Sequence, residues 1–243
     1  MWQKLTYALA FAGLLVNTPV AQAGLEEGIA AANAGQFDIA LKEFKYLADM
    51  GYAPGIYELA KMYEGGYGVP RNPYKAAELM QQAVKLGSAD AMFSLAVMYD
   101  QGQGVKIDKQ KAVDLFMSAA KKNLPAAQFN LGVMYANGDG VTQDYSGARF
   151  WYERAAANNY TLAMFNLALL YYQGLGGEKN IQRSYIWNTL AEYNGYRPAS
   201  TSRRLDEQSM SRSEREDAQE IADTIYHKIQ AGTYIAGSQI TED

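Results

Sequence analysis

One phrase of the sequence recurs four times at a constant spacing of 36 residues. It reads PGIYELAKMYEGGYGV from Pro54, DAMFSLAVMYDQGQGV from Asp90, AAQFNLGVMYANGDGV from Ala126 and LAMFNLALLYYQGLGG from Leu162. No insertion interrupts the series, so the copies align as residues 53–88, 89–124, 125–160 and 161–196. Self-similarity at such a period is typical of helical repeat proteins. The repeat therefore predicts a row of equal structural units.

The first half of each copy has the spacing of an amphipathic helix. Every copy places a tyrosine four positions after a leucine, as in Leu131 and Tyr135, and an aromatic residue two positions before that leucine, as in Phe129. Apolar side chains at these intervals share one helix face and favour its burial. The glycine that follows, Gly138 in this copy, is expected to end the helix in the left-handed conformation.

The second half of each copy predicts a second helix. Its start is indicated by residues whose side chains cap free backbone amides, namely Asn72, Asp108, Asp144 and Asn180. Pro73 follows the first of them, where a proline costs no hydrogen bond. Each copy is thus a helix hairpin that buries its apolar face only by stacking on its neighbours. The predicted fold class is all-α, a solenoid of stacked helix hairpins.

The N-terminus, residues 1–23, is predicted to be a secretory signal peptide. Lys4 precedes an apolar run from Leu5 to Val16, and Ala21-Gln22-Ala23 forms a small-residue cleavage site. The alternative, a membrane anchor, is disfavoured because a run this short makes a helix of roughly 18 Å, against a hydrocarbon core of ~30 Å. After cleavage we expect a chain that does not span the membrane, located in the periplasm or, alternatively, secreted.

Three further segments flank the repeats. Residues 24–52 contain a shorter copy and are predicted to form an N-terminal capping hairpin. Residues 197–232 are predicted to form C-terminal capping helices, since Ser211 and Glu214 make a capping box before an apolar stripe. Residues 233–243 have no periodicity and are predicted to be a mobile tail.

Composition disfavours several classes of function. The chain carries a net charge of -4 and no basic stripe, so nucleic-acid binding is not expected. It has no cysteine and one histidine, His227, which leaves almost no material for disulfides, for zinc sites or for histidine-based catalysis. We therefore expect no cofactor, no metal and no catalytic residue.

The glycine-rich loops were compared with two kinds of ligand site. A phosphate-binding P-loop needs a lysine followed by serine or threonine at the start of a helix, and no loop of the repeat has that pattern. The stretch from Asn137 to Asp144 lacks the alternating oxygen ligands and the final glutamate of a calcium-binding EF-hand. Both patterns are interpreted as helix ends and turns.

Taken together, the columns of the third copy resemble the Sel-one-like repeat, a relative of the tetratricopeptide repeat. They comprise Leu131-Gly132, Tyr135, Gly138, Asp144 and Ala148 with Trp151-Tyr152. The resemblance covers residues 53–196, and the N-terminal hairpin looks more like a tetratricopeptide unit. It implies a right-handed α-solenoid that acts as an adaptor in protein complexes. For exported bacterial members it implies envelope assembly, secretion, motility or contact with host proteins.

The resemblance does not carry every property of the family. A cysteine-rich secreted subgroup includes proteins said to bind or hydrolyse β-lactams, and this chain lacks its cysteines. The fourth copy also departs from the pattern, with Gly177 for valine, Ser184 for alanine and Asn188 for an aromatic residue. We expected this copy to be looser than the others.

The first helices have one more face, which the packing pattern does not use. Its positions follow i, i+4, i+7 and i+11, so they share a side of the helix. Their amides can both donate and accept hydrogen bonds, and apolar side chains stand beside them. The predicted partner-binding groove consists of Glu58, Lys61, Ser94, Val97, Gln101, Asn130, Val133, Asn137, Asn166, Leu169 and Gln173.

The leading hypothesis is a non-enzymatic, monomeric scaffold that binds a protein or peptide partner in this groove. One alternative is a periplasmic hydrolase of cell-wall or β-lactam-like material, which would need paired carboxylates or an activated serine. Only Glu58 and Asp90 are acidic on the face in question. Another alternative is a secreted factor that binds host proteins.

Overall fold

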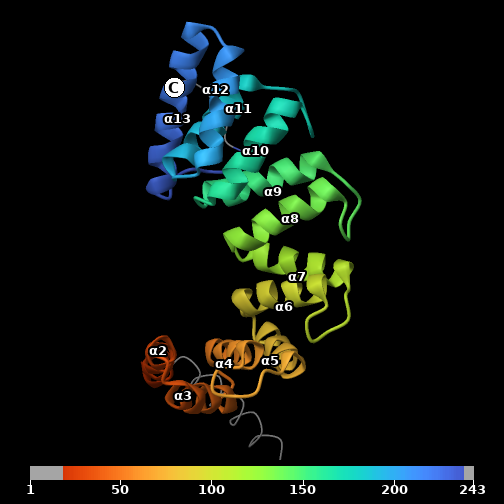
Figure 1. Ribbon diagram of the computed structural model, residues 1–243, viewed down its shortest axis with the longest axis vertical. Coiled ribbons are helices and arrows are strands. Elements are labelled where there is room, and N and C mark those ends of the chain that lie inside the picture. Colours follow the sequence, from red (N-terminus) through yellow and green to blue (C-terminus); the bar gives the residue numbers. More distant parts are fainter. Residues whose placement is uncertain (1–18, 238–243) are drawn as a thin grey trace, which may run out of the picture. The chain divides into compact units, whose positions relative to one another are not determined.

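The computed structural model describes residues 19–237, which form twelve helices and no strand (Figure 1). Their bounds are α2 Pro19–Asn33, α3 Phe37–Asp49, α4 Ala53–Gly65, α5 Pro73–Lys85, α6 Ala89–Gln101, α7 Lys109–Lys121, α8 Pro125–Asn137, α9 Tyr145–Ala157, α10 Thr161–Gln173, α11 Ile181–Tyr193, α12 Arg197–Gln208 and α13 Arg212–Gln230. The predicted all-α class is confirmed. Most of the predicted signal peptide, residues 1–18, and the end of the predicted tail, residues 238–243, lie outside the described residues.

The repeat produces eight helices of equal length, α4 to α11, each of 13 residues. Each first helix ends at a glycine with φ between 71° and 76°, a conformation that costs other residues more. Each second helix begins after the predicted cap, whose side chain accepts a backbone N–H bond, as Asn72 does from Lys75. The predicted helix starts and ends are confirmed.

A second left-handed position recurs between one hairpin and the next. It is occupied by Gly51, Gly87, Asn123, Asn159 and Gly195, with φ between 62° and 87°. Asparagine fills two of these positions because its short polar side chain tolerates this conformation better than most residues do. The Asn159 side chain also accepts a hydrogen bond of 2.8 Å from the amide of Asn194, one hairpin later.

The chain divides into two compact units, with the boundary inside α7 between Leu115 and Phe116. In the first unit α2 pairs with α3 and α4 with α5, and α3–α4 and α5–α6 contacts join successive hairpins. Fully buried side chains such as Phe44, Leu47 and Met80 form its core. The apolar stripes of the hairpins are thus buried by stacking, as the sequence pattern predicts.

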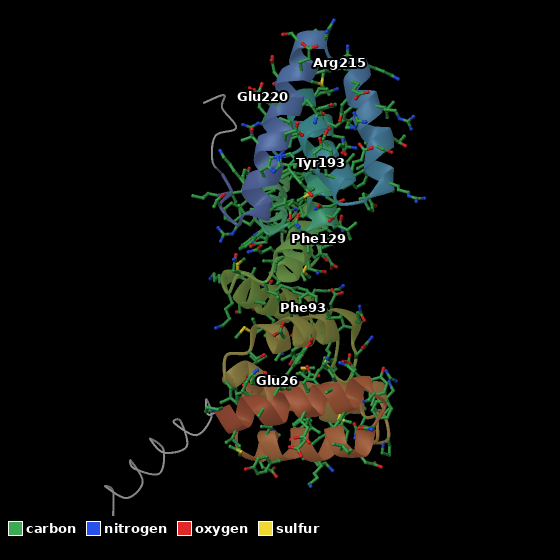
Figure 2. All side chains as sticks on the ribbon, turned by 90° about the vertical axis from the view of Figure 1, so that its left-hand side faces the viewer. Glu26, Phe93, Phe129, Tyr193, Arg215 and Glu220 are labelled. Carbon is green, nitrogen blue, oxygen red and sulfur yellow. The ribbon has the colours of Figure 1, made fainter. Side chains whose placement is uncertain are left out.

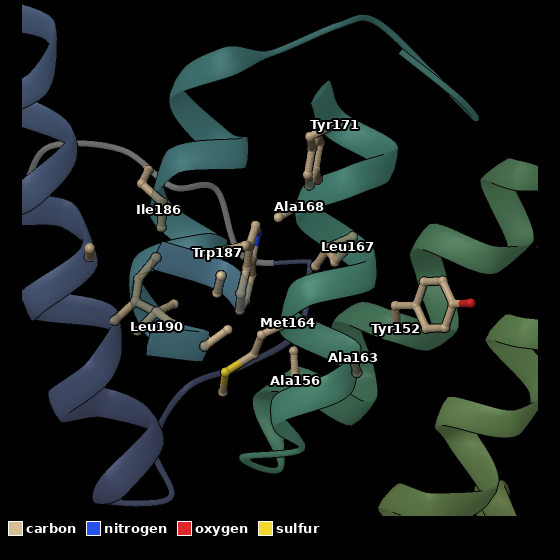
Figure 3. Close-up of a cluster of buried hydrophobic side chains, with 14 of the residues drawn as sticks. Tyr152, Ala156, Ala163, Met164, Leu167, Ala168, Tyr171, Ile186, Trp187 and Leu190 are labelled. Atoms are coloured by element: carbon tan, nitrogen blue, oxygen red, sulfur yellow. The ribbon is translucent and has the colours of Figure 1, made fainter. Parts of the chain in front are cut away.

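In the second unit α8 pairs with α9 and α10 with α11, and α9–α10 contacts join the hairpins. Helices α12 and α13 both pack against α11 (Figure 1). As a result, every residue of α11 from Ser184 to Ala191 is buried. Figure 3 shows Trp187 and Leu190 of α11 facing Met164 and Leu167 of α10 in this core.

Contacts at the two ends of the described chain extend past the predicted segment boundaries. Helix α2 begins five residues before Gly24, with Ala21 fully buried and Gln22 Oε1 accepting a hydrogen bond of 3.1 Å from the Tyr52 hydroxyl. Where the tail was predicted to begin, the Tyr234 ring lies edge-on to Trp187 with 6.1 Å between centroids. The signal peptide, the segment bounds and the mobility of the tail remain predictions.

Candidate binding surface

In the first unit, the predicted groove residues lie on α4 and α6. The Ser94 hydroxyl of α6 is 3.5 Å from the Tyr57 hydroxyl of α4, to which it donates. The unused faces of these successive first helices therefore lie side by side. Val97 is half-buried and Gln101 is exposed at the end of α6, where its Oε1 accepts a hydrogen bond from Gln103.

The charges on this face largely neutralise one another. Lys61 Nζ lies 2.9 Å from Glu58 Oε2 and 5.4 Å from the centre of the Tyr57 ring. Burial acts to lower the pKa of Lys61, but the hydrogen bond and charge of Glu58 outweigh it, with help from Asp90, and hold that pKa above its ordinary value. The two acidic groups considered for a hydrolase thus share a neighbouring ammonium group, which opposes proton transfer by either of them.

In the second unit, the predicted groove residues lie on α8 and α10 and none carries a charge. Asn130 Nδ2 donates a hydrogen bond of 2.8 Å to the Ala126 carbonyl of its own helix. Its Oδ1 receives no hydrogen bond from the described residues, so it can accept one from a ligand. Val133 beside it is half-buried against the core.

Asn166 and Leu169 extend this neutral face along α10. Asn166 hydrogen-bonds the Tyr152 hydroxyl, which only partly offsets the burial that raises the pKa of Tyr152. The same Tyr152 ring lies 5.8 Å from the ring of Phe129 of α8, which Figure 2 labels, so α8 and α10 both border it. Leu169 is 44% exposed, an unusual position for a leucine on an otherwise well-packed helix.

The last two predicted positions, Asn137 and Gln173, are exposed at the ends of α8 and α10. We name Asn130, Val133, Asn137, Asn166, Leu169 and Gln173 the α8–α10 face. It is neutral and partly apolar, which suits contact with a peptide backbone and apolar side chains. Whether any ligand binds there remains a prediction.

Other features of the second unit were not found from the sequence. A cavity of about 590 Å³ lies along the polar side of α13, and its lining includes Tyr185 and Glu207 of the neighbouring helices. Tyr185 donates to Gln219 at 2.8 Å, and Gln219 donates to Tyr193 at 2.7 Å (Figure 2). Such a cavity depends on how α12 and α13 dock on α11, which no repeat pattern predicts.

A second unpredicted feature is a tyrosine between two arginines. The Tyr171 ring centre lies 4.3 Å from the guanidinium of Arg149 and 5.4 Å from that of Arg183. Burial, with the nearby positive charge of Arg183, lowers the pKa of Arg149. Arg149 also donates to the carbonyls of Leu170 and Glu178, so it ties α9 to α10 and to the following loop.

The fourth copy is not looser at the two polar positions that break its pattern. Ser184 and Asn188 are both buried and hydrogen-bonded to the carboxylate of Asp206 on α12, at 2.9 Å each. The departures thus create the polar contact that joins α11 to the C-terminal helices.

Catalytic and metal chemistry find little support on these surfaces. Within residues 19–237, no group of three or more histidine, cysteine, aspartate or glutamate side chains could hold a metal ion. None of the helices described is both long and apolar enough to cross a membrane.

Comparison with known proteins adds a family to this geometry. The family described as Sel1 repeat matches residues 53–88, 89–124, 125–160 and 161–196. A Sel1 repeat protein from Oxalobacter formigenes is 31% identical, with a TM-score of 0.68, over 72% of this chain and 71% of that one. Curated proteins gave no match.

Two further structures are similar to different degrees. A protective antigen present in uropathogenic Escherichia coli strains, which displays an SLR fold, is 34% identical with a TM-score of 0.71. The match covers 74% of this chain but only 39% of that protein. An immunity protein, Pa5087 from Pseudomonas aeruginosa, is 19% identical with a TM-score of 0.53, over 90% of this chain and 85% of that one; this likeness is one of fold alone.

Proposed function

This chain belongs to the Sel1 repeat family, and we propose on that premise that it is a non-enzymatic scaffold that binds a protein or peptide partner. The packing columns are spent on stacking hairpins, which leaves the unused face of the first helices as the surface that can vary without loss of fold. Binding, rather than chemistry, is what such a face can provide.

The observation that carries this proposal is the composition of the α8–α10 face. Leu169 is 44% exposed next to Asn166, and Asn130 keeps an unused carbonyl oxygen. A merely solvated helix face would be expected to carry charges. We infer that the partner contributes an extended segment, whose backbone meets the asparagines and whose apolar side chains cover Leu169 and Val133.

The predicted leader supports a periplasmic location and a role in a complex of the bacterial envelope. Secretion and contact with a host protein form the alternative. Fractionation of cells that express the full-length protein distinguishes them: protein in the periplasmic fraction supports the envelope role, and protein in the medium supports the secreted one.

Site-specific photocrosslinking tests where the partner binds. A photoreactive amino acid at Leu169, on a first helix, is expected to capture a discrete protein from an envelope extract. The matched control is the same amino acid at Phe150, which is 53% exposed but lies on the second helix α9. Equal capture from both positions would contradict the assignment of the face.

Once the partner is captured, the double substitution Asn130→Ala and Asn166→Ala is expected to weaken its binding by about tenfold or more, since two hydrogen bonds of about 1 kcal/mol each are lost. The free energy of unfolding should change by less than about 1 kcal/mol, because neither amide is part of the apolar core. Titration calorimetry and urea unfolding measure the two quantities. Unchanged affinity in a normally folded variant would refute the role of these asparagines.

A further inference from the structure

One carboxylate in the second unit is buried without a cation beside it. Asp206 of α12 is 1% exposed, and no described residue forms an ion pair with it. Its Oδ2 accepts hydrogen bonds from Ser184 Oγ and Asn188 Nδ2, both at 2.9 Å. Burying an ionised carboxylate in such a place costs several kcal/mol unless a charge partner offsets it.

The same cluster contains two buried oxygens that lack a donor. Asp206 Oδ1 and Asn188 Oδ1 are both inaccessible to solvent and accept no hydrogen bond from the described residues. Both atoms are acceptors, and the two side chains already touch through the bond from Asn188 Nδ2 to Asp206 Oδ2. Orphaned buried acceptors are rare in folded proteins and call for a missing donor.

We propose that Asp206 is protonated in the folded protein, and that α12 docks on α11 through this neutral acid. A proton on Oδ1 can donate to Asn188 Oδ1 while Asn188 Nδ2 donates to Oδ2, which pairs an acid with an amide through two hydrogen bonds. One proton thus supplies the donor that both oxygens lack. The C-terminal helices are thereby held by an acid-stabilised latch.

The surrounding charges are consistent with a retained proton. Burial is the largest influence on Asp206 and raises its pKa, and the negative charge of Glu207 acts in the same direction. The hydrogen bonds from Asn188 and Ser184 and the charge of Lys179 oppose this, but the pKa remains above the ordinary value. Arg203, one turn earlier on α12, is bound to Glu192 and Glu207 instead.

The direction of the pH dependence follows from the raised pKa. Because the folded protein holds this proton more tightly than the unfolded chain, the latch is fully effective below the unfolded pKa of about 3.9. Its contribution decreases as the pH rises from there to the folded pKa of Asp206, and it stays low above that value. A rise in pH is therefore expected to loosen α12 and, through it, the docking of α13.

The substitution Asp206→Asn tests the proposal because asparagine imitates the protonated acid. Its amide can donate to Asn188 Oδ1 and accept from Asn188 Nδ2, so the variant should melt about 3 °C or more above the wild type at about pH 8. The gain should shrink toward about pH 4.5, where Asp206 is largely protonated. The matched control Asp217→Asn, the same change on α13, should show no such pH-dependent gain. A variant that is destabilised equally at both pH values would overturn the proposal.

Two measurements on the wild-type protein remain decisive if the variant fails to fold. Carbon-13 NMR of labelled aspartate side chains is expected to show one carboxyl group that titrates well above the ordinary range. Hydrogen exchange in residues 197–230 should accelerate as the pH rises through that value, beyond the acceleration of the intrinsic exchange rate. A carboxyl group of Asp206 that titrates at or below the ordinary aspartate pKa would overturn the proposal.

Discussion

Replacing Gly104 with alanine is expected to lower the free energy of unfolding by about 2–4 kcal/mol. Two costs add at this position. Gly104 has φ +67°, where an alanine is strained, and its new Cβ would fall within the van der Waals radius of the Pro73 carbonyl. Pro73 is the first residue of α5, so the loop after α6 lies directly against the helix start of the preceding repeat. Neither backbone segment can move aside without disturbing the stack.

Gly51→Ala is the matched control in the same unit. Gly51 has φ +73° but no atom within 4 Å of the position of its Cβ, so only the conformational cost of about 1 kcal/mol applies. Urea unfolding of the two variants gives the difference directly. Hydrogen exchange should locate the added loss for Gly104→Ala in residues 102–108 and at the start of α5. Equal destabilisation by the two substitutions would show that loop contact contributes nothing.

This contact illustrates what the repeat pattern does and does not predict. Helix lengths, caps and the buried columns follow from local rules, because each depends on residues within one hairpin. The first glycine of each pair is of that kind, since Gly102 ends its own helix. The second glycine is needed because a neighbouring repeat approaches: Gly104 meets Pro73, Gly68 meets Phe37 and Gly176 meets Tyr145. The sequence shows that this glycine recurs, but only the packed structure shows why.

The candidate surface was predicted to the same extent. Helical periodicity was sufficient to place Asn130 and Asn166 on the unused face, because that argument needs only the angle between residues on one helix. It could not show that Lys61 neutralises Glu58, that Asn130 uses its amide on its own helix, or that Asn166 meets Tyr152. Those contacts depend on rotamers and on residues from other helices.

The C-terminal end was the least predictable part, because the repeat no longer guides it. The stripe and capping box of α13 were visible, and both are present in the structure. The partner of Ser184 and Asn188 was not, since Asp206 is an ordinary acidic residue in a polar segment. Two breaks in a column, spaced four residues apart on one helix face, were nevertheless a signal that something polar would dock there.

Trp187→Ala is expected to cost about 3–5 kcal/mol of unfolding free energy, concentrated in the second unit. Trp187 is fully buried at the centre of the core formed by α10 and α11, where it also contacts the Tyr234 ring (Figure 3). Truncation to alanine removes a large apolar side chain, and the helices around it cannot close the cavity without disturbing the stacked hairpins on either side.

Trp187→Phe is expected to cost much less than the alanine variant, for a reason particular to this site. The buried indole Nε1–H of Trp187 has no acceptor among the described residues, so the tryptophan already bears the cost of an unsatisfied donor. Phenylalanine keeps a ring in the core, leaves a smaller cavity and removes that donor. Urea unfolding of both variants, with hydrogen exchange across α10 to α13, measures the effect. If phenylalanine costs as much as alanine, an unseen acceptor such as a buried water must bind the indole, and the account of this core as dry and apolar would be wrong.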